Sequence, residues 1–252
     1  MKNTKIGSAV RGFLEKFIEL ATMALFLWLL FVGIYAFYDA QNVNDSGKLD
    51  DKIIEVATKS GITSDSDEFS LDGLKKLNPE IVGWLKLDGT AIDYPVVQAK
   101  NNEKYLARDY KGDFATAGTP FVDYRNNKIA DPFTVIYGHR MKDSIMFSDI
   151  TRFADKAFFD HHTSGTLYTE QGKYKMEVLG FAVLNLGETD IYNVNTYKGN
   201  AAAAWNTFKK SAMYLSADAD NKASGAKLIL LSTCDKDSRH KRDVLLLRAV
   251  QQ

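Results

Sequence analysis

The feature that most constrains this chain is a long apolar segment near its start. Residues 20–38 read LATMALFLWLLFVGIYAFY, which is 19 residues without a charge. That length is about what a helix needs to cross the hydrocarbon core of a bilayer. A helix inside a protein core is the weaker alternative, because bulky side chains cover the segment on every side. The sequence therefore predicts a transmembrane helix at 20–38.

The charges around this segment predict its orientation. Basic residues precede it and acidic residues follow it: Lys2, Lys5, Arg11 and Lys16 before, with Glu15 and Glu19 as the only acids there, and Asp39, Asp45, Asp50 and Asp51 after. The basic side of such a helix stays in the cytoplasm. A cleaved signal peptide is the alternative, but its apolar region is usually only about 7–15 residues long. We therefore expect a cytoplasmic tail at 1–19 and a single-pass anchor in the cell membrane, with the remaining chain on the extracellular face.

Composition excludes several classes of protein. The 252 residues carry a formal net charge of zero and no long basic block, so nothing suggests a nucleic-acid partner. Cys234 is the single cysteine, which excludes an internal disulfide and a cysteine-based metal cluster. We expect no cofactor and no metal. A lone thiol exposed outside a cell is open to oxidation, so its presence calls for a functional reason.

Two segments with different patterns follow the apolar segment. Residues 39–75 are polar and acidic and carry a partial helical stripe within KLDDKIIEVATKSG, so they are expected to form an extracellular spacer with short helices. Residues 76–252 are expected to form one domain of many short strands. The strand-like runs lie within 81–98, 118–124, 131–139, 165–169, 173–186, 227–234 and 243–250, and one clear helix lies within 201–215. This pattern indicates a mainly β fold with a closed or nearly closed barrel.

The cysteine ends an apolar strand and precedes a strongly charged loop. A thiol with a pKa near 8.5 is only about 3% thiolate at neutral pH, so a nucleophilic cysteine needs a base or a positive neighbour. Of the four histidines, His139 ends the apolar run FTVIYGH and is held by a strand. His161 and His162 lie in a polar turn, and His240 lies in the charged loop. We favour His139, because a rigid position suits catalysis better than proximity along the chain.

An arginine completes this hypothesis. Attack on an amide carbonyl builds negative charge on oxygen, and a guanidinium supplies fixed donors for that charge. Arg242 opens the last strand and is expected near the end of the Cys234 strand, whereas Arg239 lies in the loop and Arg248 lies deeper along the strand. Taken alone, these residues leave open that the cysteine is a small core residue and the histidine is structural.

Three motifs in order resemble the sortase family. LSTC followed by RDVLLLRA is similar to the sortase signature TLxTC followed by an arginine that opens the next strand, with Leu230 where threonine is usual. VIYGH resembles the strand that carries the sortase histidine. Residues 77–127, from LNPEIVGW to YRNN, resemble the start of a class B sortase domain in particular. The resemblance runs from about residue 70 to the C-terminus.

This resemblance implies an eight-stranded β-barrel with peripheral helices and a cysteine transpeptidase activity. Such an enzyme cleaves a C-terminal sorting motif of secreted proteins through a thioester acyl-enzyme and joins them to an amine of Gram-positive peptidoglycan. Carried over by motif, Cys234 is the nucleophile, His139 the acid and base, and Arg242 the group that steadies the oxyanion or substrate backbone. The implied substrate contacts are Asn102, Tyr105, Leu106, Ser232 and Thr233, and residues 188–197 match the substrate-contacting loop. For Asn102 and Leu106, helix capping or packing is the alternative.

Two other functions stay open at this point. A membrane-tethered cysteine hydrolase would use the same three residues with water as the acceptor, because hydrolysis and aminolysis share the acyl-enzyme. A non-catalytic surface binding protein would bury Cys234 in its core. A product that contains an added amine would distinguish a transpeptidase from a hydrolase. A thiol that does not react with an alkylating reagent at neutral pH would indicate the binding protein.

Overall fold

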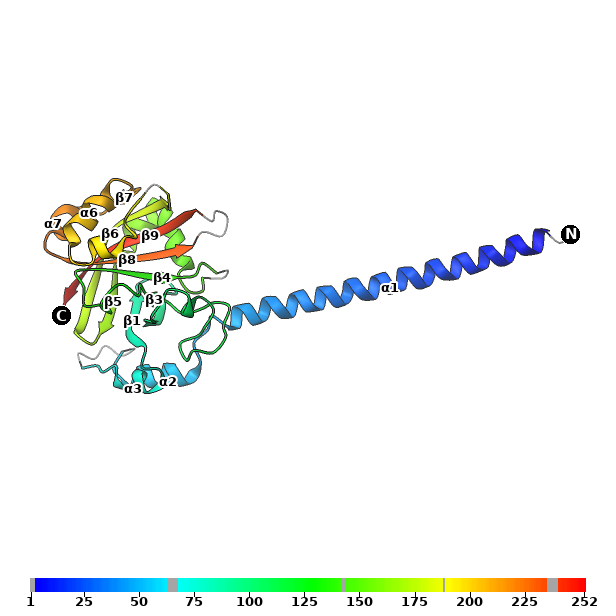
Figure 1. Ribbon diagram of the computed structural model, residues 1–252, viewed down its shortest axis with the longest axis horizontal. Coiled ribbons are helices and arrows are strands. Elements are labelled where there is room, and N and C mark those ends of the chain that lie inside the picture. Colours follow the sequence, from blue (N-terminus) through cyan, green and yellow to red (C-terminus); the bar gives the residue numbers. More distant parts are fainter. Residues whose placement is uncertain (1–2, 63–67, 142–143, 188, 235–239) are drawn as a thin grey trace. The chain divides into compact units, whose positions relative to one another are not determined.

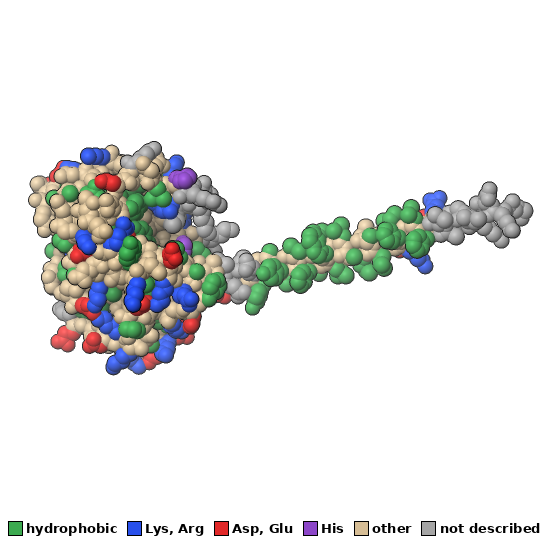
Figure 2. Space-filling model, viewed as in Figure 1, with side chains coloured by type: hydrophobic (Ala, Val, Ile, Leu, Met, Phe, Trp, Pro, Cys, Tyr) green, Lys and Arg blue, Asp and Glu red, His purple; other side chains and the backbone are tan. Residues whose placement is uncertain are grey.

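The computed structural model describes residues 3–62, 68–141, 144–187, 189–234 and 240–252, and it divides into two compact units, Met1–Val43 and Asn44–Gln252. The first unit consists of helix α1 (Asn3–Asp45) as far as Val43 (Figure 1). Within α1, the candidate span Arg11–Tyr38 contains an 18-residue window with a mean hydropathy of 2.3, none of which is buried inside the protein. Figure 2 shows hydrophobic side chains along the visible face of this helix. Its length and composition are compatible with a membrane anchor.

The second unit contains a closed barrel. Its strands are β1 (Ile81–Leu87), β2 (Asp93–Val97), β3 (Phe121–Val122), β4 (Phe133–Gly138), β5 (Ser164–Thr169), β6 (Gly172–Asn185), β7 (Tyr214–Leu215), β8 (Lys227–Cys234) and β9 (Lys241–Gln251). Among the described residues, eight of these strands form a ring in the order β5-β1-β2-β3-β4-β8-β9-β6, which the β5–β6 pairing closes. β7 pairs with β6 outside the ring. This confirms the closed barrel that the strand pattern predicts and the eight strands that the resemblance implies.

Strands β8 and β9 are apolar along most of their length, because other parts of the protein cover both of their faces. Alternate residues of β8 point to opposite faces. Ile229 and Leu231 belong to one hydrophobic cluster with residues of β1, β5 and β6, whereas Leu228 and Leu230 pack in a second cluster with Trp205. The second cluster is covered by α5 (Val194–Tyr197), α6 (Ala201–Lys209) and α7 (Ala219–Ala223). A helix was predicted within 201–215. The observed helix α6 ends at Lys209, and the last two residues of the predicted range, Tyr214 and Leu215, form β7.

Helices α2 (Asp51–Lys59) and α3 (Asp72–Leu77) belong to the same compact unit as the barrel. Ile53 and Leu74 are buried in one cluster with Trp84 of β1 and Phe121 of β3. Both helices lie within residues 39–75, which were expected to form an extracellular spacer with short helices. The apolar stripe of α2 packs on an outer face of the barrel. The remaining short helices are η1 (Lys104–Leu106), η2 (Ser148–Ala154) and α4 (Lys156–His161).

Asp50 fastens the start of α2 to the loop between β2 and β3. Its Oδ1 atom accepts hydrogen bonds from the Ile53 amide at 3.0 Å and from the Tyr110 hydroxyl at 2.8 Å, and its carboxylate pairs with Lys111. Burial alone would raise the pKa of Asp50, but the hydrogen bonds from Lys111, Ile53 and Tyr110 outweigh burial and lower the pKa to about 2. The ionised form therefore stabilises the fold above the ordinary carboxyl pKa near 4, and this stabilisation is lost as pH falls toward 2.

Replacing Asp50 by asparagine is expected to lower the thermal midpoint at neutral pH. The side chain is partly exposed, so we expect a loss of about 1 kcal/mol, equivalent to roughly 2–4 °C. The difference between the two proteins should shrink between pH 4 and pH 2, as the wild-type carboxylate becomes protonated. Thermal unfolding of the full chain in detergent micelles measures both effects. Asp51→Asn, at the next position, is the matched control. A difference that persisted unchanged at pH 2 would contradict this account of Asp50.

Candidate active site

A groove of about 350 Å³ lies where β4 and β8 finish and β9 begins. It collects side chains from six separate parts of the chain. The lining residues are Asn102, Leu106, Phe121, Tyr137, Gly138, His139, Leu186, Tyr192, Ser232 and Arg242. The structure therefore brings together five of the predicted site residues at one groove: His139, Arg242, Asn102, Leu106 and Ser232.

The strand register explains why the predicted catalytic positions meet. β4 and β8 run parallel with Gly138 opposite Thr233, so His139 and Cys234 each stand one residue further along neighbouring strands. β8 and β9 run antiparallel with Cys234 opposite Arg242. The structure describes the backbone of Cys234 but not its side chain. The backbone alone thus places the three predicted catalytic positions at one edge of the barrel.

His139 is held by a backbone carbonyl. Its Nε2 atom lies 2.7 Å from the Leu106 oxygen, and a carbonyl oxygen can only accept, so Nε2 carries a proton and donates it. Nδ1 is then the ring nitrogen left for proton exchange. Gly118, which has φ +65°, lies next to the backbone oxygens of Tyr105 and Leu106 and to the His139 ring. A Cβ atom at Gly118 would lie 2.5 Å from the Tyr105 oxygen and 3.2 Å from His139 Cδ2, so glycine is required for this close approach.

The alternative residues lie elsewhere. Arg248 donates to Glu177 Oε2 from Nε at 3.1 Å and from Nη2 at 2.8 Å, in an ion pair that does not line the groove. Arg242 lines the groove, and its Nη1 atom donates to the Lys241 oxygen at 2.8 Å. Arg239 lies outside the described residues. The other histidines, His161, His162 and His240, are absent from the groove lining among the described residues.

The structure refines the predicted role of Asn102. The neighbouring Asn101 holds the turn that leads into η1, because its Oδ1 atom accepts from the amides of Glu103 and Lys104 at 3.1 Å. The Asn102 side chain instead donates from Nδ2 to Asp123 Oδ2 at 2.9 Å and accepts from the Tyr124 amide at 3.0 Å. Asn102 is thus fixed by side-chain hydrogen bonds while it faces the groove. Leu106, 38% exposed, both lines the groove and supplies the carbonyl for His139.

Two predicted substrate contacts lie away from the groove lining. Tyr105 is 1% exposed, and its hydroxyl donates to Glu80 and accepts from Asn78 Nδ2 at 2.7 Å, so it anchors η1 from below. Thr233 is 1% exposed and, by strand alternation, faces away from Ser232. Ser232 lines the groove, where its Oγ atom bonds the Tyr192 hydroxyl at 2.8 Å. Residue 188, at the start of the loop expected to contact substrate, lies outside the described residues.

Sequence reasoning missed an aromatic wall of the groove. Tyr137 stacks on Tyr192 with ring centroids 6.2 Å apart and an interplanar angle of 22°. Tyr192 lies within the loop that the resemblance assigned to substrate contact, whereas Tyr137 was not predicted. Strand alternation could have identified Tyr137, because it stands two residues before His139, which directly follows β4, and therefore shares its face. Phe121 and Leu186 extend this wall.

Comparison with known proteins decides the family, although no family model matches the chain. Sortase B of Listeria monocytogenes is 34% identical over 247 residues, which cover 95% of this chain and 97% of that protein. The chain belongs to the class B sortases. The sortase also resembles the crystal structure of Clostridium perfringens sortase B, with a TM-score of 0.63 and 28% identity over 72% of this chain and 100% of that one.

A further likeness supports the fold alone. The Staphylococcus aureus sortase B–substrate complex matches with a TM-score of 0.68 over 86% of this sortase and 99% of that chain, at 24% identity. Family membership makes this protein a sortase-type cysteine transpeptidase. The expectations of family, fold and enzyme class are therefore confirmed. The roles of the individual residues in the groove stay predictions.

Proposed function

We propose that this sortase is anchored in the cell membrane, cleaves a C-terminal sorting motif of secreted proteins, and transfers them to an amine of the cell wall. The observation that carries the proposal is the meeting of three strand ends at one groove. β4 leads to His139, β8 ends at Cys234, and β9 presents Arg242 opposite that cysteine. Together, a cysteine, an imidazole and a guanidinium can supply the nucleophile, the acid and base, and the oxyanion donor of acyl transfer through a thioester.

Cleavage begins with the thiolate of Cys234. Residues two apart on a strand share a face, so we expect position 234 to share the groove face of Ser232. The sulfur attacks a peptide carbonyl carbon, a C–S bond forms, and the carbonyl electrons move to oxygen. The Arg242 guanidinium stabilises that oxyanion. The C–N bond then breaks as the leaving amine takes a proton from His139, which leaves a thioester on Cys234.

His139 serves both halves of the reaction through one nitrogen. Since Nε2 donates to the Leu106 oxygen, Nδ1 is the atom that gives its proton to the leaving amine and later accepts one from the incoming amine. The incoming nitrogen attacks the thioester carbonyl, the C–S bond breaks, and the thiolate is regenerated. The thiol and the imidazole titrate as a coupled pair, so their apparent pKa values belong to the pair.

The substrate and membrane parts of the proposal rest on separate observations. One structure with the same fold is a Staphylococcus aureus sortase B–substrate complex, which supports a substrate partner in general. Helix α1 is long and apolar enough to anchor the enzyme, and the basic residues before it favour a cytoplasmic N-terminus with the barrel outside. Anchoring raises the effective concentration of the enzyme near clients and wall precursors that emerge at the same membrane.

Product analysis of the full chain in detergent micelles tests this function. The probes are an internally quenched pentapeptide library, with triglycine as the amine. The proposal predicts cleavage after one preferred motif and a new mass equal to the acyl fragment joined to the amine. A cysteine hydrolase would release only the free acid at every amine concentration. A non-catalytic binding protein would leave the whole library intact.

A further inference from the structure

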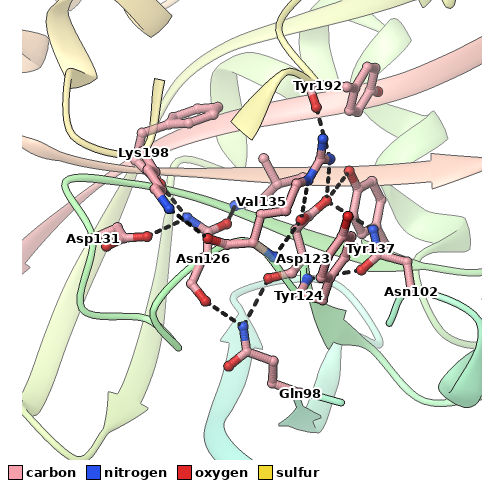
Figure 3. Close-up of polar contacts among 12 residues, drawn as sticks. Gln98, Asn102, Asp123, Tyr124, Asn126, Asp131, Val135, Tyr137, Tyr192 and Lys198 are labelled. Carbon is pink, nitrogen blue, oxygen red and sulfur yellow. Dashed lines mark hydrogen bonds and ion pairs between the residues drawn. The ribbon is translucent and has the colours of Figure 1, made fainter. Parts of the chain in front are cut away.

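A fully buried carboxylate lies beneath the groove. Asp123 directly follows β3, is 0% exposed, and accepts five hydrogen bonds (Figure 3). Its Oδ1 atom accepts from the backbone amide of Arg125 at 2.9 Å and from Arg125 Nε at 2.8 Å. Its Oδ2 atom accepts from Arg125 Nη2 at 2.7 Å, Asn102 Nδ2 at 2.9 Å and the Tyr137 hydroxyl at 3.0 Å.

These bonds connect the carboxylate to four residues that line the groove. Asn102 and Tyr137 bond Asp123 directly. Tyr192 is reached through Arg125, whose Nη2 atom also donates to the Tyr192 backbone oxygen at 2.9 Å. Ser232 follows through its hydrogen bond to the Tyr192 hydroxyl. The four lining residues come from four different segments, so one carboxylate fixes several walls of the groove at once.

The charge of Asp123 sets the direction of these bonds. Burial alone would raise its pKa, but the hydrogen bonds from Arg125 and Asn102 outweigh burial and leave the pKa below its ordinary value. Burial and the neighbouring Asp123 raise the pKa of Tyr137, so its hydroxyl keeps its proton and donates. An ionised carboxylate can only accept, and every contact around it is a donor. The orientations of the Asn102 amide and the Tyr137 hydroxyl are thus determined before any peptide binds.

We propose that Asp123 is a positioning residue that preorganises the peptide-binding walls of the groove by holding Asn102, Tyr137 and, through Arg125, Tyr192. The inference rests on the proposed function, because it takes this groove to be the site of the sorting peptide. Asp123 bonds neither His139 nor Arg242, so its effect falls on peptide binding and leaves the reactivity of the thiol unchanged. Preorganisation of this kind lowers the cost of ordering side chains on binding.

Replacing Asp123 by asparagine tests whether the residue acts through its hydrogen bonds or only through its packing. Asp123→Asn keeps the shape but turns one oxygen into an N–H₂ group that faces donors. In place of Oδ2, the N–H₂ group removes the acceptor of the Asn102 amide and the Tyr137 hydroxyl. In place of Oδ1, it removes the acceptor of the Arg125 amide and Nε, on which the link to Tyr192 depends. Asp131→Asn is the matched control, because Asp131 accepts from Asn126 Nδ2 at 2.8 Å and from the Asn127 amide at 2.9 Å, neither of which lines the groove. The control lies in the same polar region (Figure 3).

The experiment compares full-length wild type, Asp123→Asn and Asp131→Asn in detergent micelles. It measures kcat and KM for the best-cleaved peptide of the quenched library, the rate of Cys234 alkylation by iodoacetamide, and the thermal midpoint. Asp123→Asn is expected to raise KM about tenfold or more, in line with loss of about 1.4 kcal/mol of binding. Its kcat and alkylation rate should stay within about twofold of wild type, and Asp131→Asn should match wild type in KM.

Tyr137→Phe provides a second variant that keeps the aromatic ring and removes only the hydroxyl bonded to Asp123. Its KM is expected to rise about threefold, and combining it with Asp123→Asn should add little, because both changes break one network. An unchanged KM in Asp123→Asn, or strictly additive effects in the double variant, would overturn the inference while leaving the proposed function standing. Failure of the wild type to cleave any library peptide would overturn the proposed function and this inference with it.

Discussion

Replacing Cys234 by alanine is expected to abolish both cleavage and transfer while the barrel stays folded. The thiolate is the covalent nucleophile of the proposed mechanism, and water cannot replace a sulfur that must form and release a thioester. We expect residual turnover below about one thousandth of wild type, the scale on which loss of a nucleophile is measured in other enzymes. Cleavage of the quenched library and the thermal midpoint of the full chain are the two measurements.

The fold should tolerate this change, because β8 is paired on both sides. Cys234 is the last residue of a strand that pairs with β4 on one side and β9 on the other. Since the chain has one cysteine, wild type treated with iodoacetamide is the matched chemical control. It should lose the same activity as the alanine variant. Substantial cleavage by Cys234→Ala would show that another group is the nucleophile.

Arg242→Ala is expected to lower kcat by about 10²–10³-fold, because the oxyanion loses its charged donor. Arg242→Lys should recover only part of that loss, since an ammonium keeps the charge without the planar fork of donors. Steady-state kinetics on the preferred library peptide measure both variants. The thiol should still react with iodoacetamide in both, because alkylation builds no oxyanion.

Arg248→Ala is the matched control for this prediction. It removes the same side chain from the same strand, but Arg248 pairs with Glu177 and does not line the groove. Its kcat should stay close to wild type even if its thermal midpoint falls. A near-normal kcat in Arg242→Ala would move the oxyanion role to another donor, such as Arg239 in the loop.

Local patterns in the sequence were sufficient for most of the barrel. Strands such as β1 and β2 could be predicted because apolar runs flank a turn at Asp88–Gly89–Thr90, and both strands form with that hairpin between them. The parallel pairing of β4 with β8 could not be predicted, because it joins segments about 95 residues apart in the chain. That pairing sets His139 beside Cys234, so the residues alone gave a weak hypothesis and the family resemblance was needed.

Contacts between distant segments also could not be predicted for helix α2 or for the hydrogen-bond network around Asp123. The stripe on α2 was visible, but the sequence does not say what covers it, and the structure packs it on the barrel. Asp123 lies near the end of the strand-like run 118–124, and Arg125 follows this run, but nothing in this motif marks a buried carboxylate. Asp123 is buried and Arg125 half-buried because Asn102, Tyr137 and Tyr192 come from distant segments and take part in their hydrogen bonds.

Intact-mass measurement of the enzyme during turnover tests the central claim most directly. Full-length enzyme is mixed with the preferred library peptide without added amine and quenched in acid within seconds. The mechanism predicts a mass increase equal to the acyl half of the peptide, located on Cys234 by fragmentation and removed by neutral hydroxylamine. Product formation without any adduct on Cys234, or an adduct on another residue, would contradict the acyl-enzyme and the active site built around it.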